Sequence, residues 1–111
     1  MKKFIVLFRE PDGRKDQHTE EEVTLHRSNW AAWWNKWQAA GNLSGGSSLT
    51  LEGKMIRGND KQVADTIHYT GTEIIGGFLL LNAPSLDEAV AITAGCPIYE
   101  FDGYAEVREF Q

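Results

Sequence analysis

The stretch from residue 19 to residue 41 limits what this chain can fold into more than any other. It reads TEEEVTLHRSNWAAWWNKWQAAG and holds all four tryptophans. Thr19 and Glu22 match the S/T-x-x-E capping box, and Gly41 stands where a helix would end. Glutamates at positions 20–22 favour the positive end of a helix dipole. The sequence therefore predicts one long helix over residues 19–41.

Large side chains recur along this helix at spacings of three or four residues, which places them on one face. This stripe comprises Val23, His26, Trp30, Trp33 and Trp37. Trp34 lies one step off the stripe, so we expect it to be partly exposed. His26 is the only ionisable residue on the stripe.

The length of 111 residues predicts a single domain over residues 1–111. A net charge of −5, with scattered basic residues, argues against a nucleic-acid partner. The apolar run KFIVLF at residues 3–8 is too short to cross a membrane. One cysteine cannot form an internal disulfide, and no pair of cysteines offers metal-ligand spacing, so we expect a cytoplasmic protein. The sequence implies no cofactor.

The rest of the chain alternates strand and helix signals. Residues 3–8 and 70–82 read as strands that are apolar on both faces. Between them, residues 43–51 form a glycine-broken extended segment, a tight turn at 52–53 leads to a return strand at 54–57, and a turn at 59–60 precedes 62–66. A second capping box at Ser85 and Glu88 begins a short helix that ends near Gly95, and residues 104–110 alternate as a last strand.

Reduced to its long elements, this order is βαββαβ, the pattern of a ferredoxin-like α+β domain with an antiparallel sheet. Two helices can cover only one face of that sheet, yet both central strands are apolar on both faces. We therefore predict a homodimer in which two sheets pack face to face as a dimeric α/β barrel.

His26 is the first candidate for chemistry, because imidazole exchanges protons near neutral pH. A core or interface histidine with satisfied nitrogens is the alternative. Asp65 could orient such an imidazole, as carboxylates do in hydrolase triads, or could cap a turn. His18 is expected to be solvated in the polar connector at 11–17, whereas His68 could reach a pocket.

The tryptophans also allow two interpretations, because large aromatic side chains fill cores and line cavities for flat ligands. Trp30, Trp33 and His68 are the candidates for ligand binding. Cys96 is expected to be structural, since a helix C-terminus disfavours a thiolate. None of the common phosphate-binding, hydrolase or metalloprotease motifs occurs.

Four segments together resemble the YCII-related family, in the branch named for its DGPF motif. They are KFIVLFREPDG, HRSNWAAWWNKWQAAGNLSGGSSL, EIIGGF and the SLDEA segment that runs to Cys96-Pro97. The resemblance implies a ferredoxin-like dimeric α/β barrel and, in some members, a histidine–aspartate active site. The histidine falls on His26. Asp65 matches only the first letter of DGPF, and the branch with the best-argued dyad has Asp-Pro where this chain has Cys96-Pro97.

Three hypotheses follow for the function. In the first, His26, oriented by Asp65, is a general acid/base on a small organic molecule in a pocket between the helix stripe and the sheet. In the second, the same pocket binds a ligand without turnover. In the third, the protein acts through an interaction surface alone. Loss of turnover in a folded His26→Gln dimer would distinguish the first from the others.

Overall fold

A computed structural model describes all 111 residues as nine elements. In chain order these are strand β1 (Lys2–Glu10), helix α1 (Glu20–Ala39), strands β2 (Leu43–Ser48), β3 (Met55–Arg57), β4 (Gln62–Ala64) and β5 (Ile74–Ala83), helix α2 (Leu86–Ala94), the 3₁₀ helix η1 (Pro97–Phe101) and strand β6 (Tyr104–Glu109). Four strands form an antiparallel sheet in the order β2-β5-β1-β6. This is the predicted ferredoxin-like α+β order, with the two strands that are apolar on both faces in the centre.

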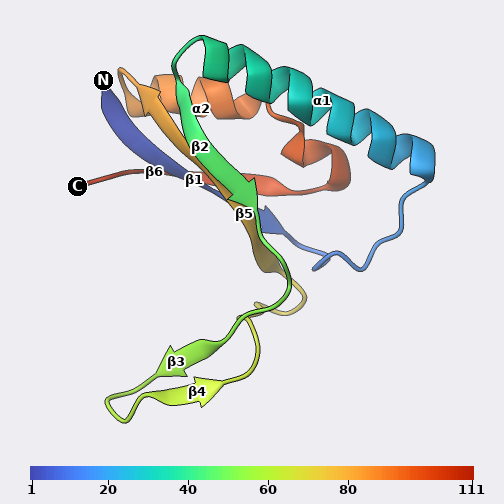
Figure 1. Cartoon of the computed structure of the whole chain (residues 1–111), viewed down its shortest axis with the longest axis vertical. Helices are drawn as coiled ribbons and strands as arrows, with labels where there is room; N and C mark the ends of the chain where they lie inside the picture. Colours follow the sequence, from blue (N-terminus) through green and yellow to red (C-terminus); the bar gives the residue numbers. More distant parts are fainter.

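Both helices lie on the same side of the sheet (Figure 1). Helix α1 begins at the predicted cap: the Thr19 hydroxyl accepts from the Glu22 backbone N–H at 3.1 Å, and the Glu22 carboxylate accepts from the Thr19 backbone N–H at 2.9 Å. Helix α2 begins with half of the predicted capping box: the Ser85 hydroxyl accepts from the Glu88 backbone N–H at 3.2 Å, but the Glu88 carboxylate makes no return bond to the Ser85 N–H. Local hydrogen bonds thus start both helices where the sequence predicts.

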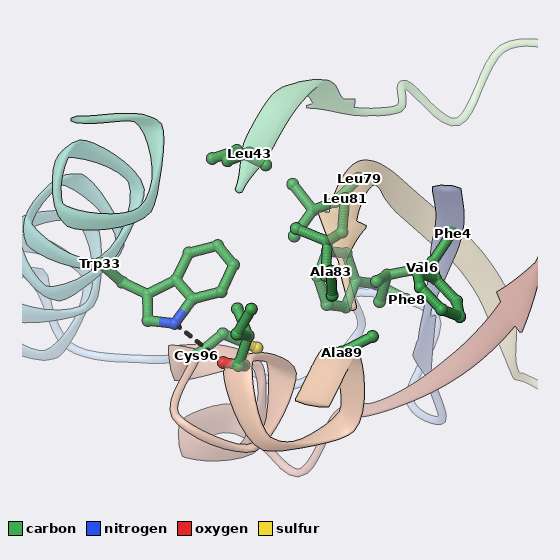
Figure 2. Close-up of a cluster of buried hydrophobic side chains, with 11 residues drawn as sticks. Phe4, Val6, Phe8, Trp33, Leu43, Leu79, Leu81, Ala83, Ala89 and Cys96 are labelled. Atoms are coloured by element: carbon green, nitrogen blue, oxygen red, sulfur yellow. Dashed lines mark hydrogen bonds between the residues drawn. The ribbon is translucent and has the colours of Figure 1, made fainter. Parts of the chain in front are cut away.

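The core fills the space between the two helices and one face of the sheet (Figure 2). Strands β1 and β5 contribute alternate residues to it, in keeping with the two-residue period of a strand. The buried cluster comprises Phe4, Val6, Phe8, Trp33, Leu43, Leu79, Leu81, Ala83, Ala89, Ile92 and Cys96. The predicted burial of Cys96 is confirmed, with 3% of the residue exposed.

No helix covers the opposite face of the sheet. There, Leu7 of β1 pairs with Phe78 of β5, and Ile5 pairs with Leu80. All four side chains remain half-buried in a single chain. The prediction that one apolar sheet face lacks a helical cover is thus confirmed, whereas the homodimer inferred from it remains a prediction.

The middle of the chain differs from the sequence prediction. Residues 54–57 were expected to return along residues 43–51, but β3 pairs with β4 in a separate two-stranded sheet. This hairpin projects away from the body of the molecule (Figure 1). The turn at Asn59 and Asp60 therefore joins the hairpin strands, and the Glu52-Gly53 pair lies in the segment leading out to it.

The glycines of β2 allow a close approach of backbones, as the sequence predicts. The pairing of β2 with β5 shifts register between Leu43 and Gly45. Gly46 adopts a φ of +149°, and a Cβ there would collide with the Phe78 carbonyl oxygen. Only glycine fits this position, so β2 can lie flush against β5.

Candidate functional site

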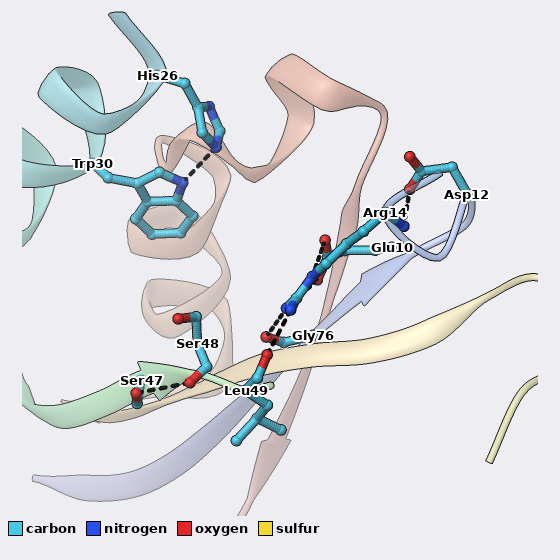
Figure 3. Close-up of polar contacts among 9 residues, drawn as sticks. All are labelled: Glu10, Asp12, Arg14, His26, Trp30, Ser47, Ser48, Leu49 and Gly76. Carbon is cyan, nitrogen blue, oxygen red and sulfur yellow. Dashed lines mark hydrogen bonds and ion pairs between the residues drawn. The ribbon is translucent and has the colours of Figure 1, made fainter. Parts of the chain in front are cut away.

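A pocket of about 530 Å³ lies between α1, η1 and the adjoining ends of β1, β2 and β5. Its size is within the range of small-molecule sites, about 300–1,000 Å³. The residues that line it are Phe8, Glu10, Arg14, His26, Arg27, Trp30, Trp34, Ser47, Ser48, Gly76, Gly77, Phe78, Leu79, Ile98 and Phe101. Figure 3 shows His26 and Trp30 on the helix side, facing Arg14 and Ser48 on the sheet side.

Both ring nitrogens of His26 have partners. Nδ1 lies 2.9 Å from a carboxylate oxygen of Glu100, on η1. The second carboxylate oxygen of Glu100 accepts from the amide of Asn29 at 2.8 Å. Nε2 accepts from the indole N–H of Trp30 at 3.0 Å. His26 is therefore held from two sides, and its side chain is 18% exposed.

These contacts determine the tautomer of the ring. An indole N–H can only donate, so Nε2 of His26 must be the unprotonated nitrogen. Nδ1 then carries the proton and donates it to Glu100. A carboxylate at Nδ1 both orients an imidazole and stabilises its protonated form, which leaves Nε2 as the nitrogen that can act as a base.

Phe101 packs against the ring face of His26. Its ring stacks on His26 at a centroid distance of 4.2 Å and on His18 at 3.7 Å. These separations place the phenyl ring between the two imidazoles. His18 is exposed, as expected, and its stacking on Phe101 also links the end of the polar connector to η1 beside the pocket.

Arg14 builds the wall opposite His26. Its guanidinium donates to the Glu10 carboxylate at 3.0 Å, to the Leu49 carbonyl at 2.6 Å and to the Gly76 carbonyl at 2.9 Å. A Cβ at Gly76 would collide with the Glu10 carboxylate, so this arrangement requires glycine there. Arg14 therefore ties the ends of β1, β2 and β5 together at the mouth of the pocket (Figure 3).

The connector that carries Arg14 is itself held by Asp12. Burial raises the pKa of the Asp12 carboxyl, but backbone hydrogen bonds, chiefly from Asp16, outweigh this and leave the pKa below its ordinary value. The N–H groups of Asp16 and Arg14 donate to it at 3.0 and 3.2 Å. Asp12 therefore stays ionised and organises the turn.

Within a single chain, Asp65 lies far from His26 and Glu100, contrary to the expectation that it orients His26. It follows β4 in the projecting hairpin, where its carboxylate accepts from the Lys54 ammonium at 2.7 Å and its side chain is 84% exposed. The carboxylate that contacts His26 is Glu100 instead. Because the β3-β4 hairpin is separate from the four-stranded sheet, Asp65, which follows β4, is separated from His26.

The three predicted ligand-binding residues separate in the structure. Trp30 lines the pocket with His26. Trp33 is 7% exposed in the core, where its indole donates to the Ile92 carbonyl at 3.3 Å. His68 lines a second cavity of about 410 Å³ at the base of the hairpin, together with Arg9 and Glu73.

Glu100, Asn29 and Arg14 escaped the sequence analysis. Asn29 could have been found, because it lies one helical turn from the stripe residue Trp33 and three residues from His26. Glu100 carries no local signal, since it reaches His26 across 74 residues of chain. The Asp-Gly-Arg turn was interpreted only as a connector.

Neither helix is long and apolar enough to cross a membrane. No three histidine, cysteine, aspartate or glutamate side chains gather in a way that could hold a metal ion. Aromatic side chains, two arginines and His26 line the pocket, and Glu100 contacts His26 from beside it.

Comparison with known proteins assigns the chain to a protein family. The YCII-related domain family matches residues 12–111, so the chain belongs to that family. One solved structure of similar fold is 5-chloro-2-hydroxyhydroquinone dehydrochlorinase from Burkholderia phenoliruptrix AC1100, in complex with 2,5-dihydroxybenzoquinone. It is 16% identical with a TM-score of 0.51, and the match covers 98% of this chain and 93% of that one. No curated protein matches the sequence.

Proposed function

We propose that this protein is an enzyme that moves a proton to or from a small flat organic molecule, with His26 as the general acid/base. The observation that carries the proposal is the Glu100–His26 hydrogen bond beside an aromatic-lined pocket. A positioned imidazole of this kind contributes about 10²–10⁴-fold to a rate. The structural neighbour, an enzyme of similar fold, was solved with a small flat ligand, which supports the choice of substrate class.

The proton transfer begins with an exchange of hydrogen bonds. The indole N–H of Trp30 donates to Nε2 of His26. A ligand whose acidic hydrogen takes the place of that N–H gives its proton to Nε2. The resulting imidazolium keeps its Nδ1 proton on Glu100, whose charge stabilises it. Return of the proton to another atom of the ligand completes the cycle.

A binding module with the same pocket is the second candidate. The occupied Nε2 favours it, because a base that already accepts a hydrogen bond must lose that bond before it can react. Turnover therefore decides between the two candidates.

The test uses 2,5-dihydroxybenzoquinone as the probe. Binding is measured by calorimetry, and displacement of Trp30 by the shift of its indole N–H resonance. Proton transfer is measured as deuterium incorporation at the ring carbons in D2O. We expect the wild type to accelerate incorporation about 10²-fold or more, and His26→Gln to lose this acceleration while still binding. His68→Gln is the matched control and should behave as the wild type.

The role of Glu100 has a control within the chain. Glu100→Gln keeps the shape but removes the charge, and we expect it to slow proton transfer about tenfold or more. Asp65→Asn makes the same change on the hairpin and should leave the rate unchanged. Binding without accelerated exchange would favour the binding module. Equal rates in the wild type and His26→Gln would refute a role for His26 in proton transfer.

A further inference from the structure

Arg27 is a pocket residue whose charge the chain leaves unpaired. It follows His26 on α1 and shares the pocket with Trp30 and Trp34, which lie three and seven positions further on. Positions at this spacing occupy one side of a helix. The six ion pairs of the structure do not include Arg27, whereas Arg14, the other arginine of the pocket, is paired with Glu10.

The pocket differs in charge from the molecule around it. Two arginines and one glutamate line it, so its formal charge is +1 with His26 neutral. The whole chain carries −5. Glu100 lies next to the pocket, where its carboxylate accepts from His26 and Asn29, and counting it brings the formal charge to zero. Within this site Arg27 is therefore the cationic side chain that no ion pair engages, and it is available to bind an anion.

The remaining walls indicate the shape of the ligand. Phe8, Trp30, Trp34 and Phe101 supply aromatic surface from three elements, and Phe8 and Trp30 meet edge to face at 5.4 Å. Aromatic walls accept flat rings, and a guanidinium can bind a carboxylate through two parallel hydrogen bonds. The pocket thus combines a slot for a ring with one cationic donor group.

We propose that this pocket selects a small flat ring that bears an anionic group, a carboxylate or an ionised hydroxyl, and that Arg27 binds that group. The proposal deepens the proposed function and shares its pocket. It concerns recognition alone, so it stands or falls separately from proton transfer by His26.

The experiment compares two ligands of nearly equal shape, 4-hydroxybenzoate and its neutral amide, 4-hydroxybenzamide. Dissociation constants are measured by calorimetry at low and at high salt. We expect the wild type to bind the carboxylate about tenfold more tightly than the amide at low salt, with a smaller ratio at high salt. Arg27→Gln should abolish the preference by weakening carboxylate binding, and Arg27→Lys should restore part of it.

Arg57→Gln is the matched control, because Arg57 is an exposed arginine on the hairpin strand β3. It should keep the wild-type preference. Equal binding of both ligands by the wild type, no saturable binding of either, or an equal loss of both in Arg27→Gln would overturn the proposal. If His26→Gln keeps the preference and the wild type transfers no proton, the proposed enzyme fails while the assignment of Arg27 holds.

Discussion

At the residue scale, two tryptophans of α1, Trp33 and Trp30, have different roles although they share one helix. Trp33 fills the core and satisfies its N–H on the Ile92 carbonyl. Trp30 donates its N–H to His26, so it links the aromatic wall of the pocket to the ring that we propose as the base. Protonation of Nε2 would turn it into a donor and break this bond. The indole of Trp30 therefore reports directly on the state of His26.

Cys96 gives a pH prediction at the same scale. Burial raises the pKa of its thiol from 9.0 to about 11. At pH 8 roughly one thiol in a thousand is then ionised, so alkylation of the folded protein should be slow and should become fast in denaturant. Rapid alkylation of the folded protein at pH 8 would contradict the burial of this side chain.

The raised pKa of Cys96 also makes stability depend on pH. The folded state favours the protonated thiol, so this contribution is complete below pH 9 and is lost as the pH rises toward 11. Urea unfolding of the wild type should show a decline over this interval. The decline should be smaller in Cys96→Ala, each protein being compared with its own value at pH 8.

At the scale of elements, the start of α1 depends on the reciprocal bonds between Thr19 and Glu22. Backbone and side-chain hydrogen bonds with Thr19 lower the pKa of Glu22. The cap is therefore complete above the ordinary pKa of a glutamate and weakens as the pH falls below it.

Thr19→Ala tests this cap. We expect it to lower the free energy of unfolding by about 1 kcal/mol, because it removes a side-chain acceptor from the first turn of the helix. Urea unfolding at neutral pH measures the change. Thr24→Ala, an exposed substitution within the same helix, is the control and should have a smaller effect. Equal effects of both substitutions would argue against the cap.

At the scale of the whole molecule, the sheet face without helices carries apolar side chains that no element of the same chain covers. Leu7 and Phe78 form a cross-strand pair at its centre. The projecting hairpin adds exposed apolar residues, with Ile56 at 69% and Val63 at 60%. Apolar surface of this extent is typical of an association surface.

We therefore expect a homodimer formed through this sheet face. Light scattering after gel filtration should give twice the mass of the 12.5 kDa chain. Leu7→Lys should produce a folded monomer, because it places a charge at the centre of the face. Leu25→Lys, at an exposed position of α1, is the control for added charge and should leave the dimer intact. A wild-type monomer in dilute solution at neutral pH would contradict the prediction.

Patterns that act over a few residues accounted for most of the fold. These patterns act through neighbours in sequence or through the conformations that a residue's own backbone can adopt. They are the capping residues Thr19 and Ser85, the strands β1 and β5 with apolar residues on both faces, and the glycines of β2. These effects operate before any distant contact forms. Residues 54–57 were the exception, because a turn at 52–53 and a turn at 59–60 both allow a hairpin and only the tertiary fold selected the second.

The sequence by itself determined that His26 lies on the tryptophan-bearing face of α1, because helical spacing fixes direction around an axis. What stands opposite that face was decided by the tertiary structure alone. Glu100 reaches His26 across 74 residues, while Asp65, the carboxylate that the sequence suggested, moves out with the hairpin. Periodicity orients a side chain toward the interior, but its partner depends on how distant elements pack.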